Sequence, residues 1–187
     1  MRFLHLGIRF PRSPGVIMIL SRWLFLGIAL TCGVLMGVAL YMEHVMGLEP
    51  CPLCMFQRMA VIASGVVALA ATMVGPRGWG VRLGAAGLLV TAATGAGLGA
   101  RQLWLQNLPE GAVPACGPGY DYMREAFPFT EVVRMALEGS GDCAKIQWQF
   151  LGLSIPGWTI LFFIAVCVVA LFLLVVGGGN RNAGLPR

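Results

Sequence analysis

Residues 157–176 read GWTILFFIAVCVVALFLLVV and contain no charged side chain. A helix needs about 20 mostly apolar residues to cross the hydrocarbon core of a bilayer, so this stretch predicts a membrane-spanning helix. Three similar stretches precede it, at residues 23–42, 55–74 and 83–99. The third is rich in glycine and alanine, which let neighbouring helix backbones approach closely. The predicted fold class is therefore all-α, an integral membrane four-helix bundle.

The composition agrees with this class. Hydrophobic residues make up 58% of the 187-residue chain and charged residues only 11%, against about 25% charged residues in typical soluble domains. The net charge of +5 would in a soluble protein raise the question of nucleic-acid binding. Here the basic residues flank the apolar stretches, and no basic stripe with stacking aromatic residues is present, so no nucleic-acid partner is expected.

The arginines predict the orientation in the membrane. Four lie in residues 1–22, two lie between the second and third apolar stretches, and two lie in residues 177–187. All eight acidic residues lie instead in residues 43–54 and 101–156. Because basic segments stay in the cytoplasm, both termini are predicted to be cytoplasmic and the two acidic loops periplasmic. Residues 23–176 then form one membrane domain between two cytoplasmic segments.

The first apolar stretch has the basic start of a signal peptide. It is long for one, however, and Leu40-Tyr41-Met42 is a poor cleavage site, so an uncleaved helix is expected. Met18 offers an alternative start, in which case residues 1–17 would be an extension.

The chain has six cysteines. Cys51 and Cys54 form a CxxC motif at the amino end of the second stretch, where Pro52 suits the first turn of a helix. A two-residue spacer permits a redox-active disulfide, and a helix amino terminus stabilises a thiolate. Cys32 and Cys167 lie inside predicted spans and are expected to be packing residues.

Arg58 follows Cys54 by four residues and so shares its helix face. An arginine inside an apolar span is costly, which makes it a functional candidate. It would stabilise a Cys54 thiolate, hydrogen-bond the carbonyl oxygen of an electron acceptor, or do both. The plainer alternative is a side chain that extends along the helix to reach water.

Cys116 and Cys143 lie in the long outer loop, residues 101–156. They form either a structural disulfide, as is common in exported proteins, or a second redox pair. A zinc site is a third interpretation, but the spacing is not that of paired CxxC motifs and no metal site is predicted.

Within this loop, residues 127–137 predict a short helix with Phe127, Val133, Ala136 and Leu137 near one face. It would lie in the membrane interface or, alternatively, pack on the outer end of the bundle. Three aromatic residues fit the belt at the entry to the fourth span: Trp148, Phe150 and Trp158.

Together these residues resemble the DsbB family of disulfide-bond formation proteins, over residues 23–176. The resemblance is specific because it combines a CxxC motif, an arginine four residues later, two loop cysteines and the run into the fourth span. The segments that carry it are EPCPLC at 49–54, FQR at 56–58, Cys116, GSGDCA at 139–144 and QWQFLGLSIP at 147–156.

The resemblance implies a bacterial inner-membrane oxidoreductase that reoxidises a periplasmic thiol oxidase, DsbA, and reduces a quinone, ubiquinone or menaquinone. It implies that DsbA attacks a Cys116–Cys143 disulfide at Cys116, and that Cys51 then exchanges with Cys143. A Cys51–Cys143 disulfide would be an intermediate, and Cys54 would become the thiolate that faces the quinone. Arg58 would support the quinone and that thiolate.

Two other interpretations stay open at this point. One is a specialised paralogue with a different thiol partner, and the other is a membrane scaffold whose disulfides are structural. Arg58 beside Cys54 favours an enzyme, since a scaffold has no need of it. One departure concerns Asn107, because the resemblance implies a histidine near this position. Asparagine does not titrate near neutral pH, so no proton-relay role is expected there.

Overall fold

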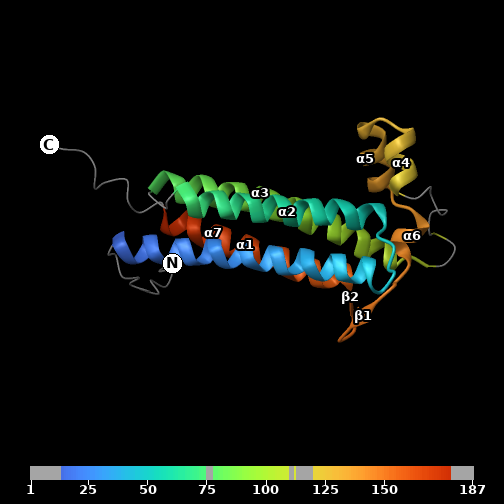
Figure 1. Cartoon of the computed structure of the whole chain (residues 1–187), viewed down its shortest axis with the longest axis horizontal. Coiled ribbons are helices and arrows are strands. Elements are labelled where there is room, and N and C mark those ends of the chain that lie inside the picture. Colours follow the sequence, from blue (N-terminus) through green and yellow to red (C-terminus); the bar gives the residue numbers. More distant parts are fainter. Residues whose placement is uncertain (1–13, 75–77, 110–111, 113–119, 178–187) are drawn as a thin grey trace, which may run out of the picture.

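The computed structural model of the protein describes residues 14–74, 78–109, 112 and 120–177. Four long helices run side by side (Figure 1), and each contains a segment long and apolar enough to cross a membrane. This confirms the predicted all-α membrane bundle. The four helices are α1 (Pro14–His44), α2 (Pro52–Val74), α3 (Gly78–Gln106) and α7 (Ile155–Val176).

The helices extend beyond the apolar stretches that predicted them. Residues 83–99, for example, lie inside α3, which continues on both sides to Gly78 and Gln106. Hydropathy marks the part of a helix that matches the bilayer, whereas the backbone hydrogen bonds continue until a residue interrupts them. Proline marks three of the beginnings, with Pro14 at the start of α1, Pro52 at the start of α2 and Pro156 in the first turn of α7.

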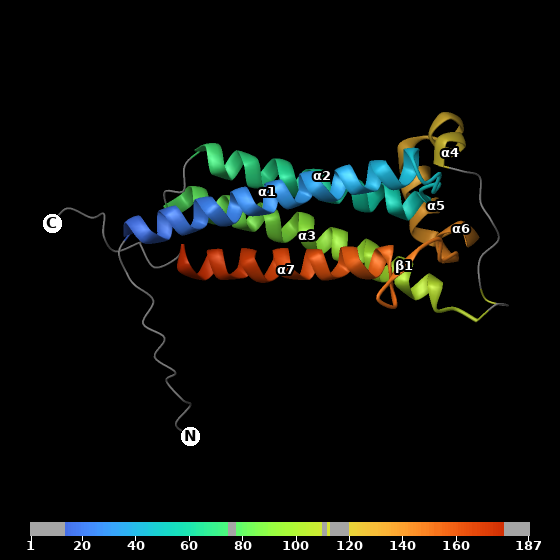
Figure 2. The same cartoon turned by 60° about the horizontal axis from the view of Figure 1, so that its bottom comes forward.

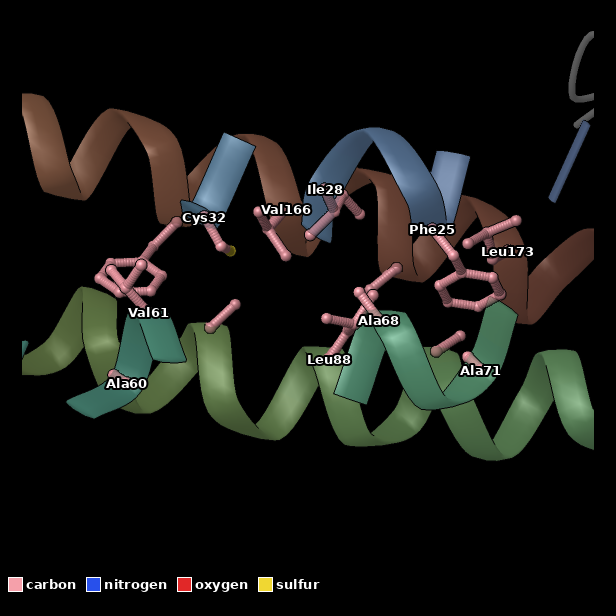
Figure 3. Close-up of a cluster of buried hydrophobic side chains, with 14 of the residues drawn as sticks. Phe25, Ile28, Cys32, Ala60, Val61, Ala68, Ala71, Leu88, Val166 and Leu173 are labelled. Carbon is pink, nitrogen blue, oxygen red and sulfur yellow. The ribbon is translucent and has the colours of Figure 1, made fainter. Parts of the chain in front are cut away.

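Figure 3 shows the core between the four helices. Phe25 of α1, Leu88 of α3 and Phe163 of α7 are all 0% exposed. Cys32 belongs to this core and Cys167 packs against it, in agreement with their interpretation as packing residues.

Glycines on α3 allow its neighbours to approach closely. A Cβ atom at Gly84 would lie 2.7 Å from the Ala71 Cβ of α2, and one at Gly99 would lie 2.7 Å from the Ile160 Cγ1 of α7. These separations are shorter than any ordinary van der Waals contact. The small residues of the third span therefore set the packing distance on both sides of α3.

Three short helices gather at the end of the bundle where α2 begins (Figures 1 and 2). They are α4 (Tyr120–Ala126), α5 (Phe129–Glu138) and α6 (Gly141–Ala144). The first residues of α1 and the last of α7 lie at the opposite end. We call the end that carries α4 to α6 the outer end.

The helix predicted in the outer loop corresponds to α5. Its buried residues are Val132 and Ala136, because α5 faces α2 and α4. Of the predicted face, Phe127, Val133, Ala136 and Leu137, only Ala136 is buried. Arg101 of α3 ties its carboxyl end to the bundle by donating to the carbonyl oxygens of Leu137 and Glu138, each at 3.1 Å. The helix thus packs on the outer end, and its placement in the membrane interface stays a prediction.

The approach to α7 forms a small hairpin that the sequence pattern did not predict. Its strands are β1 (Gln149–Phe150) and β2 (Leu153–Ser154), paired antiparallel. The two connecting residues, Leu151 and Gly152, have φ of 51° and 79°, as a type I′ turn requires. The Trp158 indole N–H donates to the Phe150 carbonyl oxygen at 3.2 Å and joins the hairpin to α7.

Candidate functional site

The CxxC motif lies at the outer end of α2, as its sequence predicts. The Sγ atoms of Cys51 and Cys54 are 3.0 Å apart as free thiols. The Cys54 backbone N–H points to the Cys51 Sγ at 3.4 Å, so the sulfur accepts one of the hydrogen bonds that a helix amino terminus leaves unpaired. Cys51 is buried and Cys54 is half-buried.

Cys143 joins this pair from the long outer loop. Its helix, α6, contacts α2 and α3. Cys143 itself is 0% exposed. It packs in one cluster with Cys51, Leu53 and Leu105. Its thiol is hydrogen-bonded to that of Cys51, so Cys51 contacts a sulfur on each side. We call Cys51, Cys54 and Cys143 the sulfur trio.

Cys51 and Cys143, the two members of the trio outside the membrane-spanning helices, have pKa values shifted in opposite directions. The hydrogen bond from Cys51, helped by the backbone N–H groups of Leu53 and Ser140, lowers the pKa of Cys143 to about 6 despite burial, which acts in the opposite direction. Cys51 has a raised pKa, because its protonated thiol is hydrogen-bonded in the trio, first with Cys143 and then with Cys54, and because it is buried. Cys143 is thus the better thiolate and Cys51 the donor that stabilises it.

A glutamine that the sequence analysis did not single out contacts two of the sulfurs. The Gln102 Nε2 of α3 lies 3.3 Å from the Cys51 Sγ and 3.2 Å from the Cys54 Sγ. Its Oε1 accepts from Gln57 Nε2 at 2.5 Å, and Thr159 of α7 donates to the Gln57 Oε1 at 2.6 Å. The available signal was an uncharged amide within an apolar helix, which requires a partner when buried.

Arg58 is placed beside the motif but is engaged elsewhere. Its guanidinium forms an ion pair with Glu43 of α1 and donates to the Ala39 carbonyl oxygen at 3.3 Å. The side chains of Arg58 and Glu43 are only 18% and 30% exposed. Glu43 was counted in the sequence only for its charge. The ion pair gives Glu43 a second role, because its carboxylate neutralises and orients Arg58 near the bilayer.

A cavity of about 600 Å³ opens beside the trio. Cys54 and Arg58 contribute polar groups to its wall. It lies at the outer end between α1 and α7, two helices that make few contacts with each other. Most of its wall is apolar and comes from these helices, with contributions from Met36, Ala39, Met42, Trp158 and Phe162.

Two residues discussed from the sequence are not among the described contacts of this site. Cys116 falls outside the described residues, so the predicted Cys116–Cys143 pair stays a prediction. Asn107 follows the last residue of α3 and is exposed, and its side-chain amide donates to the Leu103 carbonyl oxygen at 2.7 Å. Among the described residues, no group of three His, Cys, Asp or Glu side chains has the arrangement of a metal site.

Comparison with known proteins bears on this arrangement. A family model described as "Disulfide bond formation protein DsbB" matches residues 21–173, which include the trio, Arg58 and Gln102. The chain belongs to the DsbB family. Proteins named "Disulfide bond formation protein B" from Marinobacter nauticus and Hahella chejuensis are 56% and 55% identical to it, over 82% and 74% of this chain and 92% and 84% of their own length. A protein of the same name from Nitrosococcus oceani is 43% identical over 86% of this chain and 95% of its own.

Membership of the DsbB family and four apolar helices make this chain a multi-pass membrane protein of disulfide bond formation, with an oxidoreductase role in that process. The three thiols of the sulfur trio lie together at the outer end of the bundle. Their mutual contacts are those that thiol–disulfide exchange requires.

Proposed function

We propose that this DsbB-family protein takes electrons from a periplasmic DsbA-like dithiol oxidase and passes them to a membrane quinone. The observation that supports it best is the continuity of the sulfur trio. Cys143 comes from the outer loop, Cys51 lies between it and Cys54, and Cys54 borders the apolar cavity. Sulfur atoms thus lead from the loop to the cavity without a gap.

The proposed sequence begins at a Cys116–Cys143 disulfide. A thiolate of the reduced partner attacks Cys116, forms a mixed disulfide and releases Cys143 as a thiolate, which its low pKa favours. The Cys143 thiolate then attacks Cys51 of a Cys51–Cys54 disulfide. The new bond is Cys51–Cys143, and the electron pair of the broken bond leaves on Cys54. The partner's second thiolate later resolves the mixed disulfide, which completes the partner's oxidation and releases Cys116 as a thiolate. Cys116 then attacks Cys143 and releases Cys51, so that Cys51 and Cys54 can re-form their disulfide by giving up two electrons to the acceptor.

The residues around the cavity fit a quinone. Its apolar wall suits a ring and a hydrocarbon tail, while Arg58 offers a donor for a carbonyl oxygen and Cys54 faces the same space. A bound quinone, ubiquinone or menaquinone, would supply the acceptor for two electrons and two protons. Arg58 would bind and orient the acceptor, with Glu43 holding the guanidinium in place. Helices α1 and α7 would exclude water from Cys54.

This proposal includes an orientation. The outer end would face the periplasm of a bacterial inner membrane, with both chain termini in the cytoplasm. The start of α1 and the end of α7 at the opposite end support this, as does the arginine distribution. Spheroplasts treated with a membrane-impermeant thiol reagent test this orientation. The reagent should label Cys143 once the reduced partner has reacted with the outer loop of the native protein, and it should not label Cys32.

The central experiment follows each disulfide separately. Purified protein in lipid nanodiscs receives reduced DsbA-like partner with or without ubiquinone-1, and peptide mass spectrometry identifies the cysteine pairs. We expect quinone consumption to require all four outer cysteines. The Cys54→Ser variant should transfer no electrons to quinone. The Cys116→Ser variant should not react with the partner, and its Cys51–Cys54 pair should stay intact.

Cys167→Ser serves as the matched control, since it removes a thiol from within the bundle and should leave turnover unchanged. Quinone consumption by the Cys54→Ser variant at the normal rate would contradict the proposal. A scaffold with structural disulfides would show no quinone consumption in any variant, and a paralogue with another partner would turn over only with that partner.

A further inference from the structure

We propose that Gln102 is a positioning residue for the Cys54 thiolate, and that Gln57 and Thr159 fix the direction of its amide. The proposal rests on the proposed function only in taking Cys54 as the sulfur left charged. It assigns a role to three uncharged side chains from three helices, α2, α3 and α7, none of which the known activity requires by itself.

The first argument is burial. Gln57 and Gln102 are 4% and 3% exposed, although each carries an amide that water would otherwise bind. A buried amide is costly unless its donors and acceptor are paired. Here the pairing is complete between protein groups, because both oxygens accept from another side chain and the NH2 group of Gln102 faces sulfur.

The second argument is direction. Thr159 donates to the Gln57 oxygen, and Gln57 donates to the Gln102 oxygen. The Gln102 oxygen also lies 3.6 Å from the Cys54 Sγ and can accept from its protonated thiol. Once Cys54 is ionised it has no proton to donate, so the N–H groups of Gln102, 3.2 Å from Cys54 and 3.3 Å from Cys51, are the amide atoms that can pair with sulfur. Aligned hydrogen bonds polarise one another, so the positive end of the chain meets the sulfurs.

The third argument is that, in the part of the chain that the structure describes, no cationic side chain donates to Cys54. Arg58, the nearest cation along α2, donates to Glu43 and Ala39. The side-chain donors to Cys54 are thus two neutral groups, the Cys51 thiol and the Gln102 amide. The charged and titratable groups that border the same site are Cys51, Cys143, Arg58 with its partner Glu43, and, at the cavity mouth, Glu49, Asp142 and Lys145.

Alkylation of the fully reduced protein tests this without quinone or partner. Iodoacetamide labelling at a series of pH values, read for each cysteine by peptide mass spectrometry, gives a pH midpoint for Cys54. A hydrogen bond to a charged group corresponds to about 1 to 2 pH units, so Gln102→Leu should raise the midpoint by that amount, a ten- to hundredfold loss of thiolate at fixed pH. Gln102→Glu, which keeps the shape but loses the donor, should raise it further.

Gln57→Leu should raise the midpoint less, since Gln57 acts through Gln102. Asn107→Leu, the loss of an exposed amide just beyond the end of the same helix, should leave it unchanged. In every variant the Cys143 midpoint should stay near its own value, which shows that the outer end is intact. A wild-type Cys54 midpoint in both Gln102 variants overturns the proposal, and a wild-type midpoint in Gln57→Leu overturns the directional role. Failure of quinone reduction would leave these midpoints unaffected.

Discussion

Glu43 on α1 forms an ion pair with Arg58 on α2, at the level where both helices border the cavity. The pair joins two elements that the sequence separates by a turn, and it occupies the arginine that the motif places beside Cys54. The Arg58 side chain is therefore not extended into solvent and is only 18% exposed. It is held with one side on Glu43 and the Ala39 carbonyl and the other toward the cavity wall.

Glu43→Gln should weaken quinone use through Arg58. The neutral amide no longer balances the guanidinium, so Arg58 should shift and the apparent KM for quinone should rise about tenfold, with a loss of about 1 to 2 kcal/mol in the free energy of unfolding. Quinone-dependent turnover and thermal unfolding in nanodiscs measure the two effects. Glu131→Gln, which removes a charge from an exposed pair on α5, is the control. An unchanged KM in Glu43→Gln would show that the pair does not orient Arg58.

Reduced protein should gain stability as the pH rises from about 6 to about 9. The pKa of Cys143 is lowered from the ordinary 9.0 to about 6 in the folded state by its hydrogen bonds. In this window the unfolded thiol is protonated and the folded one is ionised, so unfolding takes up a proton and is disfavoured at higher pH. The contribution is fully present above pH 9 and is lost as the pH falls through 6. Denaturant unfolding of reduced protein across this range measures it, and Cys143→Ser should flatten the curve. An equally steep curve for that variant would assign the effect to other groups.

Gly95→Ala should destabilise the bundle. A Cβ atom at this position would meet the ring of Phe163, which is 0% exposed and has no room to withdraw. Overpacking of this kind costs about 1 to 3 kcal/mol. Gly97→Ala, two residues along the same helix with nothing within 4 Å of the new atom, should be neutral or slightly stabilising. Unfolding by titration with a denaturing detergent compares them. Equal stabilities would mean that α3 and α7 separate easily.

Arg101→Ala should loosen the outer loop. The guanidinium donates to the last carbonyl groups of α5 and lies 4.3 Å from the ring centroid of Trp104. Its loss should raise amide hydrogen exchange across α5 and α6 about fivefold, and Cys143 should become easier to alkylate. Arg134→Ala removes an exposed arginine from α5 itself and should leave exchange in α6 unchanged. If exchange is the same in both variants, other contacts hold the loop.

The sequence was sufficient to predict what depends on local pattern. Apolar length gave the four spans, and proline with the CxxC spacing gave the geometry of Cys51 and Cys54 at a helix start. It did not predict contacts between distant segments. Gln102 meets the sulfurs only because the glycines of α3 bring that helix close to α2, and no local period reveals which amide faces which thiol.

The outer loop shows a similar division. Its helix was predicted, but the buried face depends on contact with α2 and α4, and the hairpin depends on a turn that accepts Leu151 with positive φ. Leucine gives no signal for such a turn, because residues that favour it are usually glycine or asparagine.

The sulfur trio has an odd number of members, and this has a consequence for its chemistry. A disulfide joins two atoms, so whenever Cys51 is bonded within the trio one sulfur is left over, Cys143 in one state and Cys54 in the other. In the proposed exchange, a free Cys143 on the loop side would mark the state with a Cys51–Cys54 disulfide. A free Cys54 on the cavity side would mark the state with a Cys51–Cys143 disulfide. Because Cys51 is only 6% exposed, small thiols from solution have little access to the shared atom. In the proposed exchange, electrons that enter from the loop would therefore have one exit, through Cys54 to the cavity.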